Sequence, residues 1–157
     1  MVLMKAEDLG MDGTEGEEFF KKNKDLMSKI EKIRMEAGQS MGMGDVTNSV
    51  LPKVGILSKP RMKGNNITSR YLTPHSLHVS HAVTGAICVA TALKLKGTVA
   101  AEVGVTNGEN IEIVNIEHPS GIIEIKLEME MKDGKPNVKK AGTIRTVRKI
   151  MAGVVFH

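Results

Sequence analysis

The amino-acid sequence predicts an α+β fold: a curved, mostly antiparallel sheet wrapped around one buried helix, with an amphipathic helix on the surface. Three observations support this prediction. Apolar side chains recur at helical intervals in residues 15–37, residues 79–93 carry almost no formal charge, and the second half of the chain alternates apolar and charged residues between turn signals. Helices and strands that do not alternate regularly along a chain are typical of the α+β class.

The N-terminal part predicts a short strand followed by a long helix. Residues 2–9 begin apolar and become polar, as a strand leading into a loop does. Thr14 and Glu17 have the spacing of a capping box, and Gly38 is a residue type that commonly follows a helix end. We therefore expect an amphipathic surface helix over residues 15–37. Its apolar positions are Phe19, Leu26, Ile30, Ile33 and Ala37.

The middle of the chain predicts two strands, over residues 50–57 and 67–72, joined by a basic turn at 59–66. Pro52 lies near the start of the first strand, where its missing N–H does least harm to a sheet. The loop that precedes this strand is rich in glycine, methionine and small polar residues. Both strands are expected to belong to the curved sheet.

Residues 79–93 predict the buried helix. They are small or apolar apart from His81, and a helix that is apolar all round is buried on all sides. Ser80 could cap this helix and Gly97 could end it. About 14 residues at 1.5 Å each give a length of roughly 20 Å, which is too short to cross a bilayer. We therefore expect the helix to run through the middle of the core.

Turn signals organise the second half of the chain into two hairpins. Strands over 98–105 and 110–117 would flank Asn107-Gly108, a strong hairpin signal. Residues 123–132 then alternate apolar and charged side chains, which predicts a strand with one buried and one solvated face.

The second hairpin turns at Asp133-Gly134. Its last strand is expected somewhere between residues 138 and 150, and no internal repeat is recognised in the chain.

The composition excludes several classes of function. The 157 residues suit one domain, and only 3% are aromatic, which argues against a platform for stacking nucleic-acid bases. The formal charge of +4 is dispersed, which favours small anionic ligands. One cysteine precludes an internal disulfide, and neither a membrane span nor a signal-peptide pattern is recognised. We therefore expect a cytoplasmic protein without nucleic-acid or membrane partners.

The N-terminus of the predicted buried helix is the first candidate site. Its unpaired backbone N–H groups and the positive end of the helix dipole suit a carboxylate or a phosphate. Thr84 adds a hydroxyl, Gly85 lets a ligand approach the backbone, and His81 stands beside them. The alternative is that Gly85 is small only because the sheet packs tightly on this helix.

Polar residues outside this helix are further candidates. In the break at residues 117–121, His118 and Ser120 could direct an imidazole and a hydroxyl at a ligand, or could serve only in local turn hydrogen bonds. Glu117 could act as a base, with an outward-facing strand carboxylate as the alternative. Lys53, inside an apolar predicted strand, could bind an anion or face solvent.

The histidines and the cysteine do not predict a metal or nucleophilic centre. His75, His78 and His81 are spaced by three, which would split them between the faces of a strand, and no carboxylate joins them at a familiar ligand spacing. Cys88 lies inside the predicted buried helix, where apolar surroundings make a thiol inert. No metal site and no catalytic cysteine are expected.

Several runs of residues stand in a familiar order and spacing. They are Lys5-Ala6-Glu7-Asp8-Leu9-Gly10, Gly13-Thr14-Glu15, Leu51-Pro52-Lys53-Val54, His78-Val79-Ser80-His81-Ala82-Val83-Thr84-Gly85-Ala86, Glu117-His118-Pro119-Ser120-Gly121 and Thr143-Ile144-Arg145-Thr146-Val147-Arg148-Lys149-Ile150-Met151. With these runs the chain resembles, over nearly its whole length, the C-terminal half of the PrpF family. That family includes 2-methylaconitate cis–trans isomerases, 3-methylitaconate isomerases and 4-oxalomesaconate tautomerases.

The resemblance implies a fold similar to that of diaminopimelate epimerase, in which two similar domains each wrap a curved antiparallel sheet around a central helix. The substrate lies between the domains. The chemistry implied is a cofactor-free proton transfer at a carbon next to a carboxylate, with carboxylates docked at helix N-termini. By this resemblance Lys53 and the turn with His81, Thr84 and Gly85 contact the substrate.

Two departures from the family pattern limit what is expected of this chain. Family members carry a first domain of comparable size, and the lysine and cysteine that would transfer the proton belong to it, so no catalytic residue is expected here. Diaminopimelate epimerase has a second catalytic cysteine at the start of this helix, where Ala82 stands in this chain. Cys88 lies too far along to replace it, so racemase chemistry is not expected.

The sequence therefore predicts one domain over residues 1–157, the substrate-binding half of a cofactor-independent isomerase or tautomerase. It would move a proton on a small unsaturated di- or tricarboxylic acid, with a first-domain partner. The alternative is a non-catalytic carboxylate-binding module or a homodimer of this domain. The residues expected to bind substrate are Lys53, His81, Thr84, Gly85 and Ser120.

Overall fold

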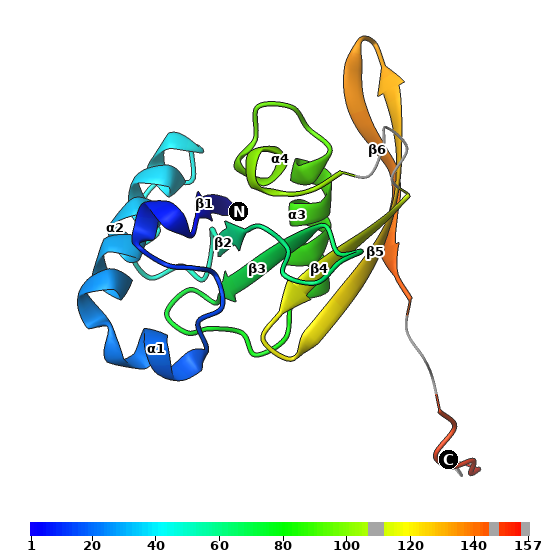
Figure 1. Cartoon of the computed structure of the whole chain (residues 1–157), viewed down its shortest axis with the longest axis horizontal. Helices are drawn as coiled ribbons and strands as arrows, with labels where there is room; N and C mark the ends of the chain where they lie inside the picture. Colours follow the sequence, from blue (N-terminus) through cyan, green and yellow to red (C-terminus); the bar gives the residue numbers. More distant parts are fainter. Residues whose placement is uncertain (107–111, 145–147, 155–157) are drawn as a thin grey trace.

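The computed structural model describes residues 1–106, 112–144 and 148–154. Its strands form one six-stranded sheet in chain order (Figure 1). The strands are β1 (Val2–Lys5), β2 (Val54–Ser58), β3 (Ile67–Leu72), β4 (Ile113–His118), β5 (Gly121–Lys132) and β6 (Lys135–Thr143). The β1–β2 and β3–β4 pairs are parallel and the other three pairs are antiparallel. The predicted α+β class and mostly antiparallel sheet are confirmed.

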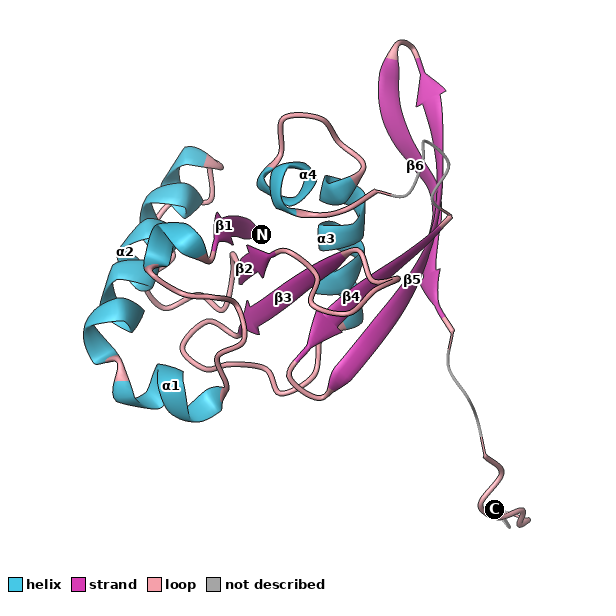
Figure 2. Cartoon of the chain, viewed as in Figure 1, coloured by secondary structure: helices cyan, strands magenta, loops and turns pink. Residues whose placement is uncertain are grey.

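Helices cover both faces of this sheet (Figure 2). Helix α3 (Val83–Leu93) packs with α4 (Val99–Val103) against one face, and the paired helices α1 (Glu17–Lys22) and α2 (Lys24–Ser40) cover the other. A short 3₁₀ turn, η1 (Glu7–Leu9), follows β1. The N-terminal half of the chain therefore supplies one helical layer and the central segment supplies the other.

Strand β3 shows how the sequence divides the two layers. Successive side chains of a strand point to opposite faces. Ile67 accordingly packs in the apolar cluster of α3, while Leu72 packs in the cluster of α2. All six residues of β3 are buried because both faces of the strand are covered. The odd-numbered side chains thus face α3 and the even-numbered ones face α1 and α2.

The predicted helix over residues 15–37 is correct in kind but wrong in its details. It is broken at Asn23, whose backbone leaves the helical region and whose amide donates to the Phe19 carbonyl at 2.7 Å. Helix α1 begins after Gly16, and Thr14 does not cap it, because the Thr14 hydroxyl bonds Asp12 instead. Helix α2 runs past Gly38 to Ser40.

The predicted strand over residues 98–105 is wrong, because most of this segment is helix α4. The Thr98 side chain caps the helix by accepting from the Ala101 N–H at 3.2 Å, and two alanines follow in the first turn. A capping threonine with alanines outweighs the β-branched residues around them. The predicted Asn107-Gly108 turn lies outside the described residues.

Helix α3 is not buried on all sides as predicted. Gly85, Ala86 and Val89 are buried, but Thr84 and Cys88 lie on an exposed side of the helix. The expected burial of Cys88 is therefore wrong, since the sheet curls round only part of the helix. The helix begins at Val83 with Ala82 as its N-cap, and Ser80 does not cap it. Ser80 instead makes a 3.4 Å contact with a ring nitrogen of His78.

The second half of the chain keeps its predicted hairpin but not its predicted burial. The turn is confirmed, with φ of 52° at Asp133 and 74° at Gly134, and β6 begins earlier than expected, at Lys135. Ile125 and Leu127 of β5 are buried, but Met131 is 70% exposed. The hairpin extends beyond the layer of α3, as Figure 1 shows, so its outer half lacks a helix to cover it.

Candidate functional site

Helix α3 begins with an open N-terminus. Ala82 has an extended backbone and makes no side-chain cap, and the first bond of the helix runs from the Ala86 N–H to the Ala82 carbonyl at 2.9 Å. Within the described residues, the N–H groups of Val83, Thr84 and Gly85 therefore have no acceptor. The Thr84 side chain is exposed beside them. Three backbone donors and a hydroxyl can receive one carboxylate.

Gly85 packs against the ring of Tyr71. A Cβ at this position would lie 2.4 Å from the Tyr71 Cε2 atom, closer than atoms can approach. Tight packing of the sheet on the helix therefore explains this glycine. Its N–H still faces the open first turn, so packing and ligand contact are compatible at Gly85.

His81 is locked in place just before the helix. It is 5% exposed, its Nε2 lies 3.0 Å from the Ser69 hydroxyl, and its Nδ1 lies 3.0 Å from the Ala82 carbonyl. A carbonyl only accepts, so Nδ1 carries the proton, and Nε2 accepts from Ser69. Burial, with smaller contributions from His118 and His78, lowers the pKa of His81 to about 4. The imidazole is therefore neutral near pH 7 and holds the turn that precedes α3.

The β4–β5 turn lies against this segment. The Ser120 hydroxyl donates to the Val79 carbonyl, and the Ser120 N–H donates to Nδ1 of His118 at 3.2 Å. Burial is the main reason why the pKa of His118 lies below its ordinary value. His118 and His81 both line a hollow of about 440 Å³. The fold thus brings the sequence-predicted Ser120 beside His81 and the start of α3, which lie far from it in the chain.

Lys53 lies at the end of the sheet where β3 ends and the chain continues toward α3. It lies one residue before β2 rather than inside a strand, so its predicted place in a strand is wrong. The cis bond between Leu51 and Pro52 turns the chain just before it, and the Lys53 carbonyl accepts from the Val2 N–H at 2.8 Å. Val54 pairs with Leu72, the last residue of β3. Lys53 is therefore placed where β3 leaves the sheet toward α3.

Glu117 is neither a free base nor an outward-facing carboxylate. It is 7% exposed and accepts from the Arg61 and Met62 N–H groups, the Asn65 amide and the Thr68 hydroxyl. Burial opposes its ionisation, but these four donor groups outweigh burial and lower its pKa to about 2. Glu117 therefore stays ionised and anchors the loop between β2 and β3.

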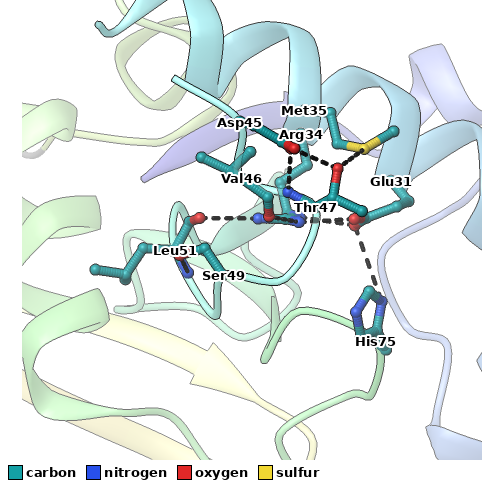
Figure 3. A network of polar contacts seen from close by, with 9 residues as sticks. All are labelled: Glu31, Arg34, Met35, Asp45, Val46, Thr47, Ser49, Leu51 and His75. Carbon is teal, nitrogen blue, oxygen red and sulfur yellow. Dashed lines mark hydrogen bonds and ion pairs between the residues drawn. The ribbon is translucent and has the colours of Figure 1, made fainter. Parts of the chain in front are cut away.

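Sequence reasoning missed a second anchor, formed by Arg34 and Glu31 on α2 (Figure 3). Arg34 is fully buried, and its Nε and Nη2 atoms each donate to the Glu31 carboxylate at 2.7 Å. Its guanidinium also donates to the carbonyls of Leu51 and Val46 at 2.9 Å. These bonds hold the loop that leads to Lys53. The available signal was a Glu and an Arg spaced by three on the inner side of an amphipathic helix.

The three spaced histidines do not share a centre. His75 is exposed, 3.9 Å from the Glu31 carboxylate, while the His78 and His81 rings pack against Tyr71. Among the described residues, no group of three or more His, Cys, Asp or Glu side chains could hold a metal ion. No helix within that part of the chain is long and apolar enough to cross a membrane.

A known structure shares this fold. The crystal structure of methylitaconate-Δ-isomerase superposes with a TM-score of 0.74 and 27% sequence identity, over 91% of this chain and 42% of that one. The fold is accordingly of the PrpF and diaminopimelate epimerase type. Residues 1–157 also match the sequence model of the PrpF protein family, and the chain belongs to that family.

Three relatives carry names that describe isomerisation of unsaturated acids. The (4E)-oxalomesaconate Δ-isomerase of Novosphingobium is 41% identical over 99% of this chain and 42% of its own length. The 4-oxalomesaconate tautomerase of Pseudomonas putida is 38% identical over 99% of this chain and 42% of its length, and the 3-methylitaconate isomerase of Eubacterium barkeri is 31% identical over 99% and 44%. The chain thus spans less than half the length of these relatives.

Proposed function

We propose that residues 1–157 form one domain, corresponding to the C-terminal half of a PrpF-type isomerase, and that this domain binds the substrate of a proton-transfer reaction. The substrate would be a small unsaturated di- or tricarboxylic acid. The observation that carries the proposal is the match to the PrpF family along the whole chain. The named activities of the relatives and the 42% share of the solved isomerase support it.

The open N-terminus of α3 supports a role in binding a substrate carboxylate. The N–H groups of Val83, Thr84 and Gly85 and the Thr84 hydroxyl would donate to it, and the helix dipole would favour its charge. Lys53 would contribute a positive charge from the same end of the sheet. His81 and Ser120 would contact the substrate from the hollow beside this turn, and both already position the turn through Ser69 and Val79.

The proposed reaction removes a proton from a carbon next to a carboxylate and returns it to another carbon of the same unsaturated acid. The negative charge that develops on the carboxylate oxygens would be stabilised by the N–H donors of α3. Neither described candidate base suits the first step, since Glu117 is saturated with donors and His81 is held by Ser69. The base would therefore come from a first-domain partner, and the proposal requires no cofactor.

Proton NMR in D₂O tests this proposal. The chain alone should bind cis-aconitate and methylitaconate weakly and should introduce no deuterium into them. The other part of the 41% identical Novosphingobium isomerase, expressed separately and added, should bring deuterium to the carbon next to a carboxylate. A Thr84→Val variant, which loses the hydroxyl, should lower this exchange. Exchange by the chain alone would show that it carries its own base and would reject the division into halves.

The exposed side of α3 favours one second candidate, a homodimer of this domain or a carboxylate-binding module without catalysis. Thr84 and Cys88 are exposed on the central helix, and Val79 and Ile122 near its start are 58% and 47% exposed. A second copy could cover this surface. Sedimentation velocity decides the point, because a monomer at about 100 μM would exclude a stable dimer of ordinary interface size.

A further inference from the structure

A larger hollow lies on the opposite face of the sheet from α3, next to the loop that precedes α1. Its volume is about 730 Å³, and its polar lining includes Thr14, Arg61, Arg70 and His118. These residues come from the loop before α1, the loop after β2, strand β3 and the end of β4. Figure 1 shows that the loop before α1 and the β4–β5 turn lie at the same end of the sheet. We call this hollow the arginine pocket.

Arg70 is the principal charge of the arginine pocket. The residue is 6% exposed, its Nε donates to the Glu15 carbonyl at 2.7 Å, and its Nη1 donates to the Ser69 carbonyl at 3.3 Å. Among the described residues no carboxylate oxygen lies within 4.0 Å of its nitrogens, and its Nη2 makes no hydrogen bond. Charged groups that are this deeply buried are ordinarily paired. Arg70 therefore brings a guanidinium without an anionic partner to the wall of the hollow.

The acidic residues near Arg70 are engaged with neutral donors. Glu117 accepts from the loop N–H groups, the Asn65 amide and the Thr68 hydroxyl, as described above. Asp12 accepts from the N–H and hydroxyl of Thr14, and the Glu15 carboxylate accepts from the Asp12 and Gly13 N–H groups at 2.9 Å. These three carboxylates reduce the positive potential, but among the described residues none of them accepts a hydrogen bond from Arg70. Arg61, an exposed residue, adds a second guanidinium from the neighbouring loop.

We propose that the arginine pocket binds a small molecule through a carboxylate or phosphate group, held by Arg70 and Arg61. The planar guanidinium fork suits the oxygens of both groups. The volume exceeds that of a single ion, and Met62, Pro119 and Ile122 supply apolar walls for the rest of the ligand. The pocket shares His118 and Ile122 with the hollow beside His81. Arg70, however, points to the opposite face of β3 from the N–H groups of α3, so the proposal does not depend on the proposed function.

An NMR titration of the ¹⁵N-labelled chain tests the proposal. Citrate and inorganic phosphate are added separately, with total ionic strength kept constant by sodium chloride. We expect saturable shifts of the Thr14, Arg61 and Met62 amides and of the Arg70 Nε–H signal. The variants Arg61→Ala and Arg70→Lys should each weaken binding about tenfold, since each removes a charge-assisted contact. Lys132→Gln, which removes an exposed charge from the β5–β6 hairpin, should leave binding unchanged.

The outcomes distinguish a carboxylate ligand from a phosphorylated one, and the arginine pocket from the proposed substrate site at α3. Saturation by citrate alone assigns a carboxylate ligand, and saturation by phosphate alone assigns a phosphorylated one. Shifts that do not saturate by about 50 mM, or that persist unchanged in both arginine variants, would overturn the proposal. Arg61 is exposed, so loss of binding in its alanine variant cannot be ascribed to unfolding. The Val83, Thr84 and Gly85 amides report the proposed substrate site independently.

Discussion

Arg34 and Arg70 are both buried arginines on the side of the sheet covered by α1 and α2, yet their surroundings differ. Arg34 donates to the carboxylate of Glu31, three residues before it on the same helix, and to two backbone carbonyls. Arg70 donates only to two backbone carbonyls and lines the arginine pocket. The contacts with Glu31 raise the pKa of Arg34, whereas burial lowers the pKa of Arg70.

This difference separates two uses of a buried cation. A guanidinium whose carboxylate is supplied by the same chain stabilises a loop, and Arg34 does so for the segment before Lys53. A guanidinium without such a partner is less favourable in the folded state, and an external anion can supply the missing charge. The comparison therefore predicts that loss of Arg34 affects mainly stability, whereas loss of Arg70 affects mainly the response to anions.

The largest effect is expected for Arg34→Ala. The substitution leaves the Glu31 carboxylate without its partner and frees the Leu51 and Val46 carbonyls, so it should lower the free energy of unfolding by about 3 kcal/mol. Urea unfolding followed by circular dichroism measures this change. Arg34→Lys keeps the positive charge but loses the planar guanidinium. Its free energy of unfolding should therefore lie between those of the wild type and Arg34→Ala. A loss below about 1 kcal/mol would show that the loop does not depend on Arg34.

A smaller loss, of about 2 kcal/mol at pH 7, is expected for Glu117→Gln, because an ionised acceptor of several hydrogen bonds becomes a neutral one. The pKa of Glu117 is about 2 in the folded protein and 4.5 ordinarily. Its stabilisation is therefore complete above pH 4.5 and is lost as the pH falls toward 2. Urea unfolding from pH 2 to 7 should show the two proteins converging at low pH. A constant difference would contradict an electrostatic origin.

Arg70→Gln should cost only about 1 kcal/mol, since it removes hydrogen bonds to two carbonyls and leaves no buried carboxylate unpaired. A more specific test of Arg70 is how anions change the unfolding midpoint of the protein. Saturating citrate or phosphate should raise the unfolding midpoint of the wild-type chain and have little effect on Arg70→Gln. Lys132→Gln is the matched control and should respond like wild type. An equal response of all three proteins would reject a specific role for Arg70.

The smallest effect is expected on the other face of β3. Ser69→Ala removes the hydroxyl that His81 Nε2 accepts from, a bond between two neutral groups, and should lower stability by about 1 kcal/mol or less. The same variant should raise the pKa of His81 little, because burial is the main cause of its low value. Histidine proton NMR between pH 3 and 8 measures that pKa, and a value near 6.5 would assign the shift to Ser69 instead.

Pattern and local chemistry were sufficient for most of the elements. The helical spacing in residues 15–37, the alternation along β5 and the Asp133-Gly134 turn each led to the correct kind of element, because each depends on neighbouring residues alone. The errors arose where distant contacts add to a local signal that the pattern of branched residues obscured. Residues 98–105 have branched side chains suited to a strand, but the segment packs on α3 as a helix.

Candidate residues divide in the same way. The start of α3, His81 and Ser120 could all be named as candidates from the sequence, and the structure places Ser120 beside the segment that precedes α3. The roles of Glu117, Arg34 and Arg70 could not be derived. Although Glu31 is only three positions from Arg34, the contacts to Leu51, Arg61 and Glu15 span 17 to 56 positions of the chain.

The sequence by itself determined the α+β class, a central helix and a surface helix, the membership in a family of acid isomerases and the place of the helix terminus proposed to bind a carboxylate. These features follow from periodicity, turn chemistry and local motifs. Only the tertiary structure decided which charges are paired and which are left unpaired, because pairing depends on which loops the curled sheet brings together. Arg34 and Arg70 are alike as residues in the sequence, and the fold alone distinguishes them.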